Sequence, residues 1–319
     1  MELFIIGNGF DVYHGIESRY SHFADYVEEH NSDLYDCVSE FLGHPEDFWK
    51  DFETNLQHLD EDNLTDYARA YLMDYGADDW SDSGHHDYQY EIEQKIDLLT
   101  DEMTKMFIAW VNQIDISKAS PDLRGILKEN ALYLTFNYTQ TLERVYKIDK
   151  KKVFHIHGEV GDDSYIYGHD YIKPKEKEVD ISSLSDEERE AYYDEKSSDD
   201  VRVTEGEQII NGYYQKNYKP VSDIIKSNKD YFDSLKDVTR IHILGFSMGD
   251  IDLPYIEEIY NTLEKPDDVK WVVSFYNKDE DKEHNFQLEN VGVDVVANVT
   301  NEDMSYWKEK DTQTIIEFN

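Results

Sequence analysis

Four short polar segments of this chain each follow an apolar run, and their side chains are of kinds that bind nucleotides or move protons. The segments are Gly7-Asn8-Gly9 with Asp11, Asn137-Tyr138, His155-Ile156-His157-Gly158, and Gly245-Phe246-Ser247 with Asp250 and Asp252. Glycine permits a tight turn and a close approach of the backbone to a ligand. Histidine accepts a proton near neutral pH, and an asparagine amide both donates and accepts hydrogen bonds. The set indicates a site for a phosphate, a ribose or an amide.

The apolar runs before these segments are predicted to be strands of one sheet. They cover residues 3–6, 131–136, 153–156 and 241–244, and two later runs cover 271–276 and 293–299. Continuous apolar runs separated by helices are typical of a parallel sheet that is covered on both faces. The fold class is therefore predicted to be α/β, with a doubly wound, mainly parallel sheet. Because the carboxyl ends of such strands form the ligand crevice, we expect the four polar segments to converge there.

Apolar residues at helical spacing predict helices between the strands. The expected helical stretches lie within 17–58, 91–114, 208–218 and 221–235, and from Leu253 onward with Pro254 in the first turn. Ser185 with Glu188 forms a capping box for a short helix. We expect one domain over residues 1–319, with a helical insertion at about 17–130 and a charged insertion at about 161–235.

Composition excludes several classes of protein. The chain has 319 residues, 39% of them hydrophobic, and a formal charge of −40, which repels the phosphate backbone of nucleic acids. Solubility or adaptation to salt explains that charge most simply, and the alternative is that the acidic face mimics DNA or recruits a basic partner. No apolar segment long enough for a membrane span and no signal peptide is found, so we expect a cytoplasmic protein. Cys37 is the only cysteine, which excludes an internal disulfide and a cysteine-built zinc site.

The first two polar segments also fit simpler roles. Gly7-Asn8-Gly9 lacks the third glycine of the dinucleotide fingerprint, since Val12 stands at that position, and a plain tight turn is the alternative. Asn137 could cap a helix that starts at Thr139, because asparagine is a preferred capping residue. Capping and catalysis do not exclude one another.

The histidines and aspartates have structural alternatives as well. His155 and His157 alternate along a strand, so they could form half a metal site or be two core histidines. His85 and His86 lie in an acidic loop at 75–90, where adjacent side chains diverge, and ordinary surface histidines are favoured over a metal site. Asp252 is expected to be the N-cap residue of the next helix. No metal is predicted.

The ordered motifs LFIIGNGFD, LTFNYTQTLE, FHIHG and ILGFSMGDIDLPY resemble the bacterial abortive-infection H (AbiH) family, and more remotely the sirtuin-type NAD-binding fold. The resemblance covers residues 3 to about 260. It implies a sirtuin-like variant of the Rossmann fold, a role in antiphage defence, and NAD as the ligand.

The resemblance also implies roles for individual residues. Asn137 matches the asparagine that sirtuin-like enzymes place beside the nicotinamide ribose, and His157, directly before Gly158, matches their catalytic base. The residues implied to bind NAD are Gly7, Asn8 and Gly9 at the phosphates, Asp11 near the mouth of the first helix, Gly245 and Ser247 at the phosphates or the adenosine ribose, and Asp250, which is assigned to no particular group of NAD.

One departure from the sirtuin pattern decides between activities. Sirtuin deacylases carry a zinc module built on four cysteines, which Cys37 alone cannot supply, so protein deacylation is disfavoured. Sirtuin-like proteins of phage defence that lack this module tend to hydrolyse NAD. Cleavage of the N-glycosidic bond needs a base near neutral pH and a group that holds the ribose or the water. We therefore expect an NAD glycohydrolase in which His157 is the base and Asn137 positions the ribose or the water.

A non-catalytic nucleotide-binding sensor or interaction protein is the alternative function. Hydrolysis or transfer on another nucleotide is weaker, because the chain has no P-loop and no clear carboxylate set for Mg²⁺. The expected partners are NAD or a related nucleotide, a phage-derived trigger or defence protein, and further copies of the chain. Segments 75–90 and 161–200 are the candidates for covering the site or meeting a partner.

Overall fold

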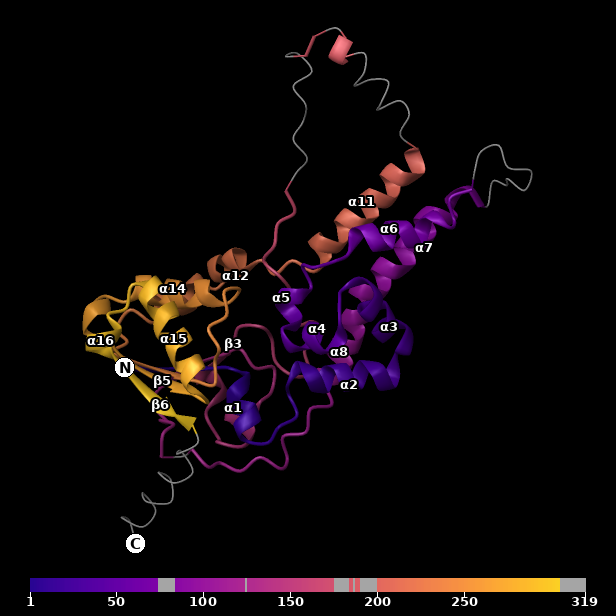
Figure 1. Ribbon diagram of the computed structural model, residues 1–319. Helices are drawn as coiled ribbons and strands as arrows, with labels where there is room; N and C mark the ends of the chain where they lie inside the picture. The colour runs from indigo at the N-terminus through magenta and orange to yellow at the C-terminus, as the bar shows by residue number, and fades with distance from the viewer. Residues whose placement is uncertain (74–83, 124, 175–183, 186, 190–199, 305–319) are drawn as a thin grey trace. The chain divides into compact units, whose positions relative to one another are not determined.

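A parallel sheet of six strands, in the order β3-β2-β1-β4-β5-β6, forms the core of one part of the chain. Three of its strands, β3, β5 and β6, are labelled in Figure 1. The computed structural model describes residues 1–73, 84–123, 125–174, 184–185, 187–189 and 200–304. The strands are β1 (Glu2–Ile6), β2 (Leu132–Thr135), β3 (Val153–His155), β4 (Arg240–Leu244), β5 (Lys270–Phe275) and β6 (Val299–Asp303). All neighbouring pairs are parallel, which confirms the predicted α/β class.

The register of the central strands brings their carboxyl ends together. In β1, Ile6 lies opposite Thr135 of β2 and Leu244 of β4. The strand order reverses between β1 and β4, since the chain builds outward to β3 on one side and to β6 on the other. In open α/β sheets, a ligand crevice lies outside the carboxyl ends at such a reversal.

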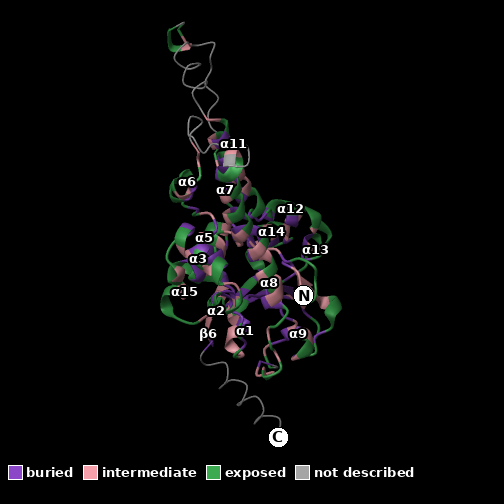
Figure 2. Ribbon diagram, turned by 90° about the vertical axis from the view of Figure 1, so that its right-hand side faces the viewer, coloured by how far each residue is buried: buried purple, intermediate pink, exposed green. Residues whose placement is uncertain are grey.

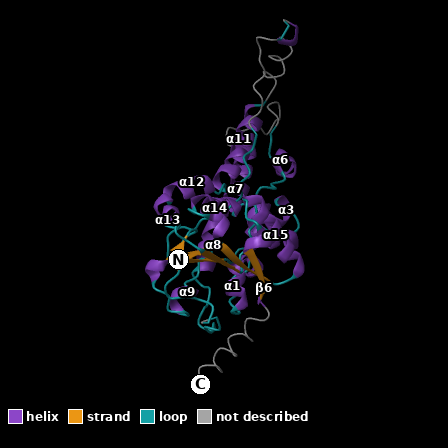
Figure 3. Ribbon diagram, turned by 90° about the vertical axis from the view of Figure 1, so that its left-hand side faces the viewer, coloured by secondary structure: helices purple, strands orange, loops and turns teal. Residues whose placement is uncertain are grey.

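Helices cover both faces of the sheet. Along β1, Leu3 and Ile5 belong to one core cluster, whereas Phe4 and Ile6 belong to the other. The first cluster includes residues of α12 (Val221–Ser227), α13 (Lys229–Asp233), α14 (Leu253–Thr262) and α15 (Lys278–Val291), and the second includes residues of α1 (Asn8–Tyr13) and α9 (Thr141–Arg144). Figure 3 shows α12, α13 and α14 on one side of the strands and α1 and α9 on the other. Burial on both faces explains why the strands read as continuous apolar runs.

The chain divides into two compact units. The unit that contains the sheet comprises Met1–Phe23, Phe107–Tyr167 and Lys219–Asn319, and the helical unit comprises Ala24–Met106 and Gly168–Tyr218. Both stretches of the helical unit fall within the two ranges expected to be insertions. Its elements include α3 (Ser32–Phe41), α4 (Pro45–Lys50), α5 (Phe52–Asn55), α6 (Glu61–Arg69), α7 (Asp87–Asp97) and α11 (Val201–Lys216), and the chain also forms α2 (Tyr20–His30) and α8 (Met103–Val111).

The helices have buried and exposed sides, as Figure 2 shows for α3, α5 and α12. Within the part of the chain that the structure describes, none of the helices combines the length and the apolar character that a membrane crossing requires.

Most predicted helices are found close to their expected positions. The helix expected within 91–114 is present as α7, a π-helical turn at Leu98–Glu102, and α8. The capping box is confirmed, because the Glu188 backbone N–H donates to the Ser185 hydroxyl oxygen at 3.3 Å and the Ser185 backbone N–H donates to Glu188 Oε2 at 2.9 Å. Parts of the expected segments 75–90 and 161–200 lie outside the described residues.

The strand predicted at 293–299 is wrong. Val295–Asn298 form the short helix α16, and β6 begins only at Val299. The Asp294 carboxylate accepts a hydrogen bond from the Ala297 backbone N–H at 3.1 Å and so caps this turn. A local side-chain bond has therefore outweighed the β-propensity of the valines.

Two glycines of α11 provide a matched test of packing in the helical unit. A Cβ atom on Gly206 would lie 2.6 Å from Cε1 of Tyr88 and 2.8 Å from Cδ1 of Ile92, whereas a Cβ atom on Gly212 would meet nothing within 4 Å. We expect Gly206→Ala to lower the free energy of unfolding by about 1–3 kcal/mol, because buried side chains must move. Gly212→Ala should raise it by about 0.5–1 kcal/mol through helix propensity. Urea denaturation measures both, and equal effects of the two substitutions would contradict this packing.

Candidate functional site

The turns after β1 and β4 touch backbone to backbone at the reversal of strand order. A Cβ atom on Gly7 would lie 2.5 Å from Cα of Phe246, and one on Gly9 would lie 2.8 Å from Cα of Gly245. Gly245 itself has φ +62 and would place a Cβ atom 2.2 Å from the Phe10 nitrogen. These glycines are therefore required by the contact between the two turns, whether or not a ligand is bound.

Backbone N–H groups of the first turn already have partners within the protein. Gly7 donates to the Leu244 carbonyl at 3.1 Å, Gly9 to the Gly245 carbonyl at 2.7 Å, and Phe10 to the Gly7 carbonyl at 3.0 Å. A phosphate at this turn would therefore need other donors. Contact between Gly7-Asn8-Gly9 and NAD phosphates stays a prediction.

Three of the expected ligand-binding side chains are exposed: those of Asn8, Ser247 and Asp250. Asn8 exchanges hydrogen bonds with Ser18, and Asp250 accepts one from Gln287 at 2.9 Å. The structure therefore leaves all three at the surface of the two turns. Their contact with NAD is also a prediction.

Asp11 is fully buried and holds the segment after β2 against α1. Its Oδ2 accepts from the Thr139 hydroxyl at 2.5 Å and its Oδ1 from the Thr141 hydroxyl at 2.8 Å. Burial raises the pKa of Asp11 to about 6, although the two threonine hydrogen bonds oppose that rise. Both carboxylate oxygens thus serve a contact inside the protein.

Asn137 lies at the end of β2, beside the turn after β1. Its Nδ2 donates to the Gly7 carbonyl at 3.0 Å, which fixes the amide, whereas its Oδ1 is buried and has no hydrogen-bond partner among the residues that the structure describes. The predicted capping of a helix at Thr139 is wrong, because α9 begins at Thr141 with Gln140 as its N-cap residue. The unpartnered oxygen is an acceptor that the fold itself does not use.

His157 lies beyond the end of β3, among aromatic rings and next to two charged groups. Its side chain is 3% exposed, and its Nε2 lies 3.6 Å from Oδ1 of Asp252. The same oxygen accepts from Nζ of Lys219 at 2.8 Å. Burial, and after it the charge of Lys219, holds the pKa of His157 well below its usual range. The imidazole is therefore neutral at neutral pH and has a lone pair that can accept a proton.

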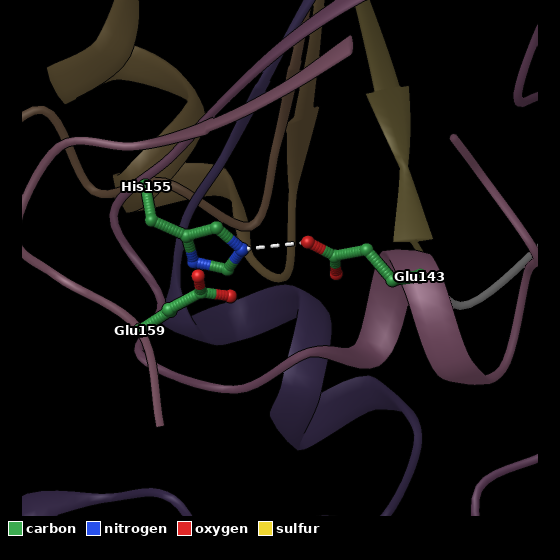
Figure 4. A group of neighbouring side chains, drawn as sticks. All are labelled: Glu143, His155 and Glu159. Atoms are coloured by element: carbon green, nitrogen blue, oxygen red, sulfur yellow. Dashed lines mark hydrogen bonds and ion pairs between the residues drawn. The ribbon is translucent and has the colours of Figure 1, made fainter. Parts of the chain in front are cut away.

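His155 has different partners from His157, so the two histidines do not form half a metal site together. Its Nε2 lies 2.8 Å from Oε1 of Glu143 (Figure 4), and its Nδ1 lies 3.0 Å from the Asn137 carbonyl. Burial alone would lower the pKa of His155, but the Glu143 carboxylate outweighs it and raises that pKa. The pair thus supports the backbone of Asn137.

Glu159 completes the group in Figure 4. Among the described residues, Glu143, His155 and Glu159 are the one group whose potential metal-binding atoms all lie within 4.8 Å of one another. Glu159 already pairs with Lys150 and accepts from Gln140 at 2.8 Å. These contacts make the group an ion-pair network in which Oε2 of Glu143 has no hydrogen-bond partner among the described residues, and we assign no metal to it.

Sequence reasoning missed Lys219 and the hydroxyls of Thr139 and Thr141, and it gave Asp252 only a capping role. Asp252 is the N-cap residue of α14, but its side chain makes no capping hydrogen bond. Lys219 follows α11 in sequence and carries no motif that would mark it. Only the fold brings it to His157.

Comparison with known proteins gives one match. A family model described as bacteriophage abortive infection AbiH matches residues 3–275. No curated protein and no solved structure matches the chain.

Asp11 should make folding stability depend on pH. Because its pKa is about 6 when folded and 3.8 in the reference state, the folded protein binds more protons between these values. Its contribution to the free energy of unfolding therefore falls as pH rises from about 4 to 7, by up to roughly 3 kcal/mol. Asp11→Asn should remove that fall, as measured by urea denaturation across this range. Asp223→Asn, at a largely exposed carboxylate, is the control, and a parallel pH dependence of wild type and Asp11→Asn would contradict the assignment.

Proposed function

The chain belongs to the bacteriophage abortive infection AbiH family, whose model covers residues 3–275 of its 319, and from this premise we propose that it binds NAD and hydrolyses it to nicotinamide and ADP-ribose. Membership of the family supports a role in phage abortive infection. Loss of NAD stops a cell's metabolism, which would halt the growth of an infecting phage.

The strand order supports a dinucleotide as the ligand. The order 3-2-1-4-5-6 is that of the Rossmann fold, in which a dinucleotide lies across the crevice at the reversal of strand order. In this chain, the turns after β1 and β4 form that point, and Asn137 is joined to the first turn through the Gly7 carbonyl. The candidate site therefore lies where the fold class accommodates such ligands.

The unpartnered Oδ1 of Asn137 is the observation that carries the proposal. A buried acceptor without a partner costs free energy, so its retention calls for an explanation. A ribose hydroxyl would satisfy it, and the contact between Nδ2 and the Gly7 carbonyl would keep the amide in one orientation for that purpose. An uncharged amide also leaves the developing ribose cation undisturbed.

His157 would supply the proton transfer. The base takes a proton from a ribose hydroxyl or from water, while the bond between nicotinamide nitrogen and ribose carbon breaks and nicotinamide keeps the bonding electrons. Water then supplies the hydroxyl group of ADP-ribose. A neutral imidazole is required for this step, and burial together with Lys219 keeps His157 neutral.

A nucleotide-binding sensor without turnover is the second candidate. It is favoured by one observation, namely that the side chain of His157 is only 3% exposed. Under this alternative, NAD or a related nucleotide binds at the turns but never reaches the imidazole. The acidic surface would then dock a partner of the defence system.

Activation and assembly belong to the proposal as well. An active NAD hydrolase would harm the host, so we expect the chain to stay silent until a phage-derived trigger or a partner protein acts on it. We also expect it to self-associate. NAD is the proposed substrate, and the proposed reaction uses no metal.

Release of nicotinamide from NAD tests the activity directly. The purified chain should release nicotinamide in the presence of its trigger, for which lysate of phage-infected cells is a practical source. His157→Ala and Asn137→Ala should each lower the rate by about 10²- to 10⁴-fold, since each removes a group that acts in the reaction. The assay follows nicotinamide by liquid chromatography.

His30→Ala, at an exposed histidine of α2, is the matched control and should keep the wild-type rate. Circular dichroism verifies that every variant is folded. Unchanged rates in both His157→Ala and Asn137→Ala would disprove the mechanism. Binding of NAD by calorimetry without any release would support the sensor instead.

A further inference from the structure

One carboxylate oxygen connects the candidate base to a buried lysine. Oδ1 of Asp252 lies 2.8 Å from Nζ of Lys219 and 3.6 Å from Nε2 of His157. The lysine side chain has no exposed surface, and that of Asp252 is 20% exposed. A fully buried ammonium is costly unless a carboxylate pairs with it, so the fold retains this pair at a substantial desolvation cost.

Asp252 is not engaged in the role that its position would suggest. Aspartate at an N-cap position usually accepts a hydrogen bond from the first turn of its helix, and this is worth about 1 kcal/mol. The Asp252 side chain makes no such bond to α14. Its carboxylate is directed to Lys219 and His157 instead.

His157 lies next to aromatic rings and to the pair formed by Lys219 and Asp252. Aromatic rings of Phe136, Tyr138 and Tyr255 pack around the imidazole, at centroid distances of 5.2, 6.5 and 5.9 Å. Burial, and after it the charge of Lys219, lowers the pKa of His157. Oδ1 of Asp252 lies 3.6 Å from its Nε2, which is buried and has no hydrogen-bond partner among the described residues. An apolar environment strengthens the influence of both charges.

The ring nitrogens of His157 consequently differ. In a neutral imidazole, one ring nitrogen carries a proton and the other carries a lone pair. The group that lies next to a ring nitrogen decides which of the two is protonated. A carboxylate oxygen next to Nε2 favours a proton on that nitrogen. The lone pair then belongs to Nδ1, which is the nitrogen that can accept the proton of a substrate.

We propose that Asp252 is the positioning residue of His157 and selects the tautomer with the proton on Nε2. Lys219 holds the Asp252 carboxylate beside Nε2. This inference rests on the proposed function for its chemical purpose. In the proton-transfer step, the O–H bond of a ribose hydroxyl or water breaks, Nδ1 gains the proton, and the oxygen keeps the electron pair. Asp252 then faces an imidazolium and stabilises its charge, as the third member of a nucleophile–base–carboxylate set does.

The charges of Lys219 and Asp252 should shift the pKa of His157 in opposite directions. Lys219→Met removes a positive neighbour and should raise the pKa of His157, whereas Asp252→Asn leaves the ammonium uncompensated and should lower that pKa further. The double variant Lys219→Met with Asp252→Leu removes the pair together, which buried ion pairs tolerate better than loss of one partner. It should lose the preference for the Nε2–H tautomer.

Nuclear magnetic resonance of the ¹⁵N-labelled imidazole measures both the tautomer and the pKa, on the full chain and without NAD. The wild-type protein should show His157 protonated on Nε2. The pKa of His157 should be higher in Lys219→Met and lower in Asp252→Asn than in the wild type. Asp233→Asn, at the exposed ion pair with Lys229, is the control and should leave His157 unchanged. A wild-type proton on Nδ1, or a double variant with the wild-type tautomer, would overturn the proposal even if both single variants fail to fold.

Nicotinamide release then separates this inference from the proposed function. If the chain hydrolyses NAD, the acidic limb of the pH–rate profile should shift to higher pH in Lys219→Met, and Asp252→Asn should lower the rate roughly tenfold to a hundredfold. A merely structural role would lower rates without moving that limb. If no NAD is hydrolysed, the resonance measurement still decides whether Asp252 and Lys219 set the state of His157.

Discussion

The backbone contact between the turns after β1 and β4 is the constraint on which the candidate site depends. Gly7, Gly9 and Gly245 allow the two turns to approach to a distance that no side chain would permit. This contact places the Gly7 carbonyl where the amide of Asn137 donates to it at 3.0 Å. The turn after β1 thus organises its neighbours on both sides, and the glycines have a structural purpose before any ligand is considered.

Buried polar contacts then fix the segments that follow β2 and β3. Asp11 holds two threonine hydroxyls of the first segment, and the pair of Glu143 and His155 supports the Asn137 backbone. A further charged pair, formed by Lys219 and Asp252, lies next to His157. Each of these groups is removed from water at a cost, so the site combines a rigid backbone frame with charges whose interactions are strengthened by burial.

The sequence was sufficient to predict the sheet, because strands that are buried on both faces have continuous apolar runs. It was also sufficient to predict which polar residues follow the strands. It failed at 293–299, where the Asp294 cap competes with β-propensity, and it placed a helix start at Thr139 instead of Thr141. It could not find Lys219, since no local pattern indicates that a lysine far along the chain will be buried beside His157. Partners of this kind are set by tertiary packing, whereas strand ends are set by local sequence.

A crystal structure with a carbocyclic NAD analogue, which cannot be hydrolysed, tests most directly whether NAD binds at the carboxyl ends of β1, β2 and β4. The ring that replaces the nicotinamide ribose should lie within hydrogen-bond reach of Oδ1 of Asn137, at roughly 2.6–3.2 Å, with the imidazole of His157 beside it. An analogue that binds away from these two residues would contradict the assignment. Failure of the analogue to bind at any concentration tested would contradict it as well.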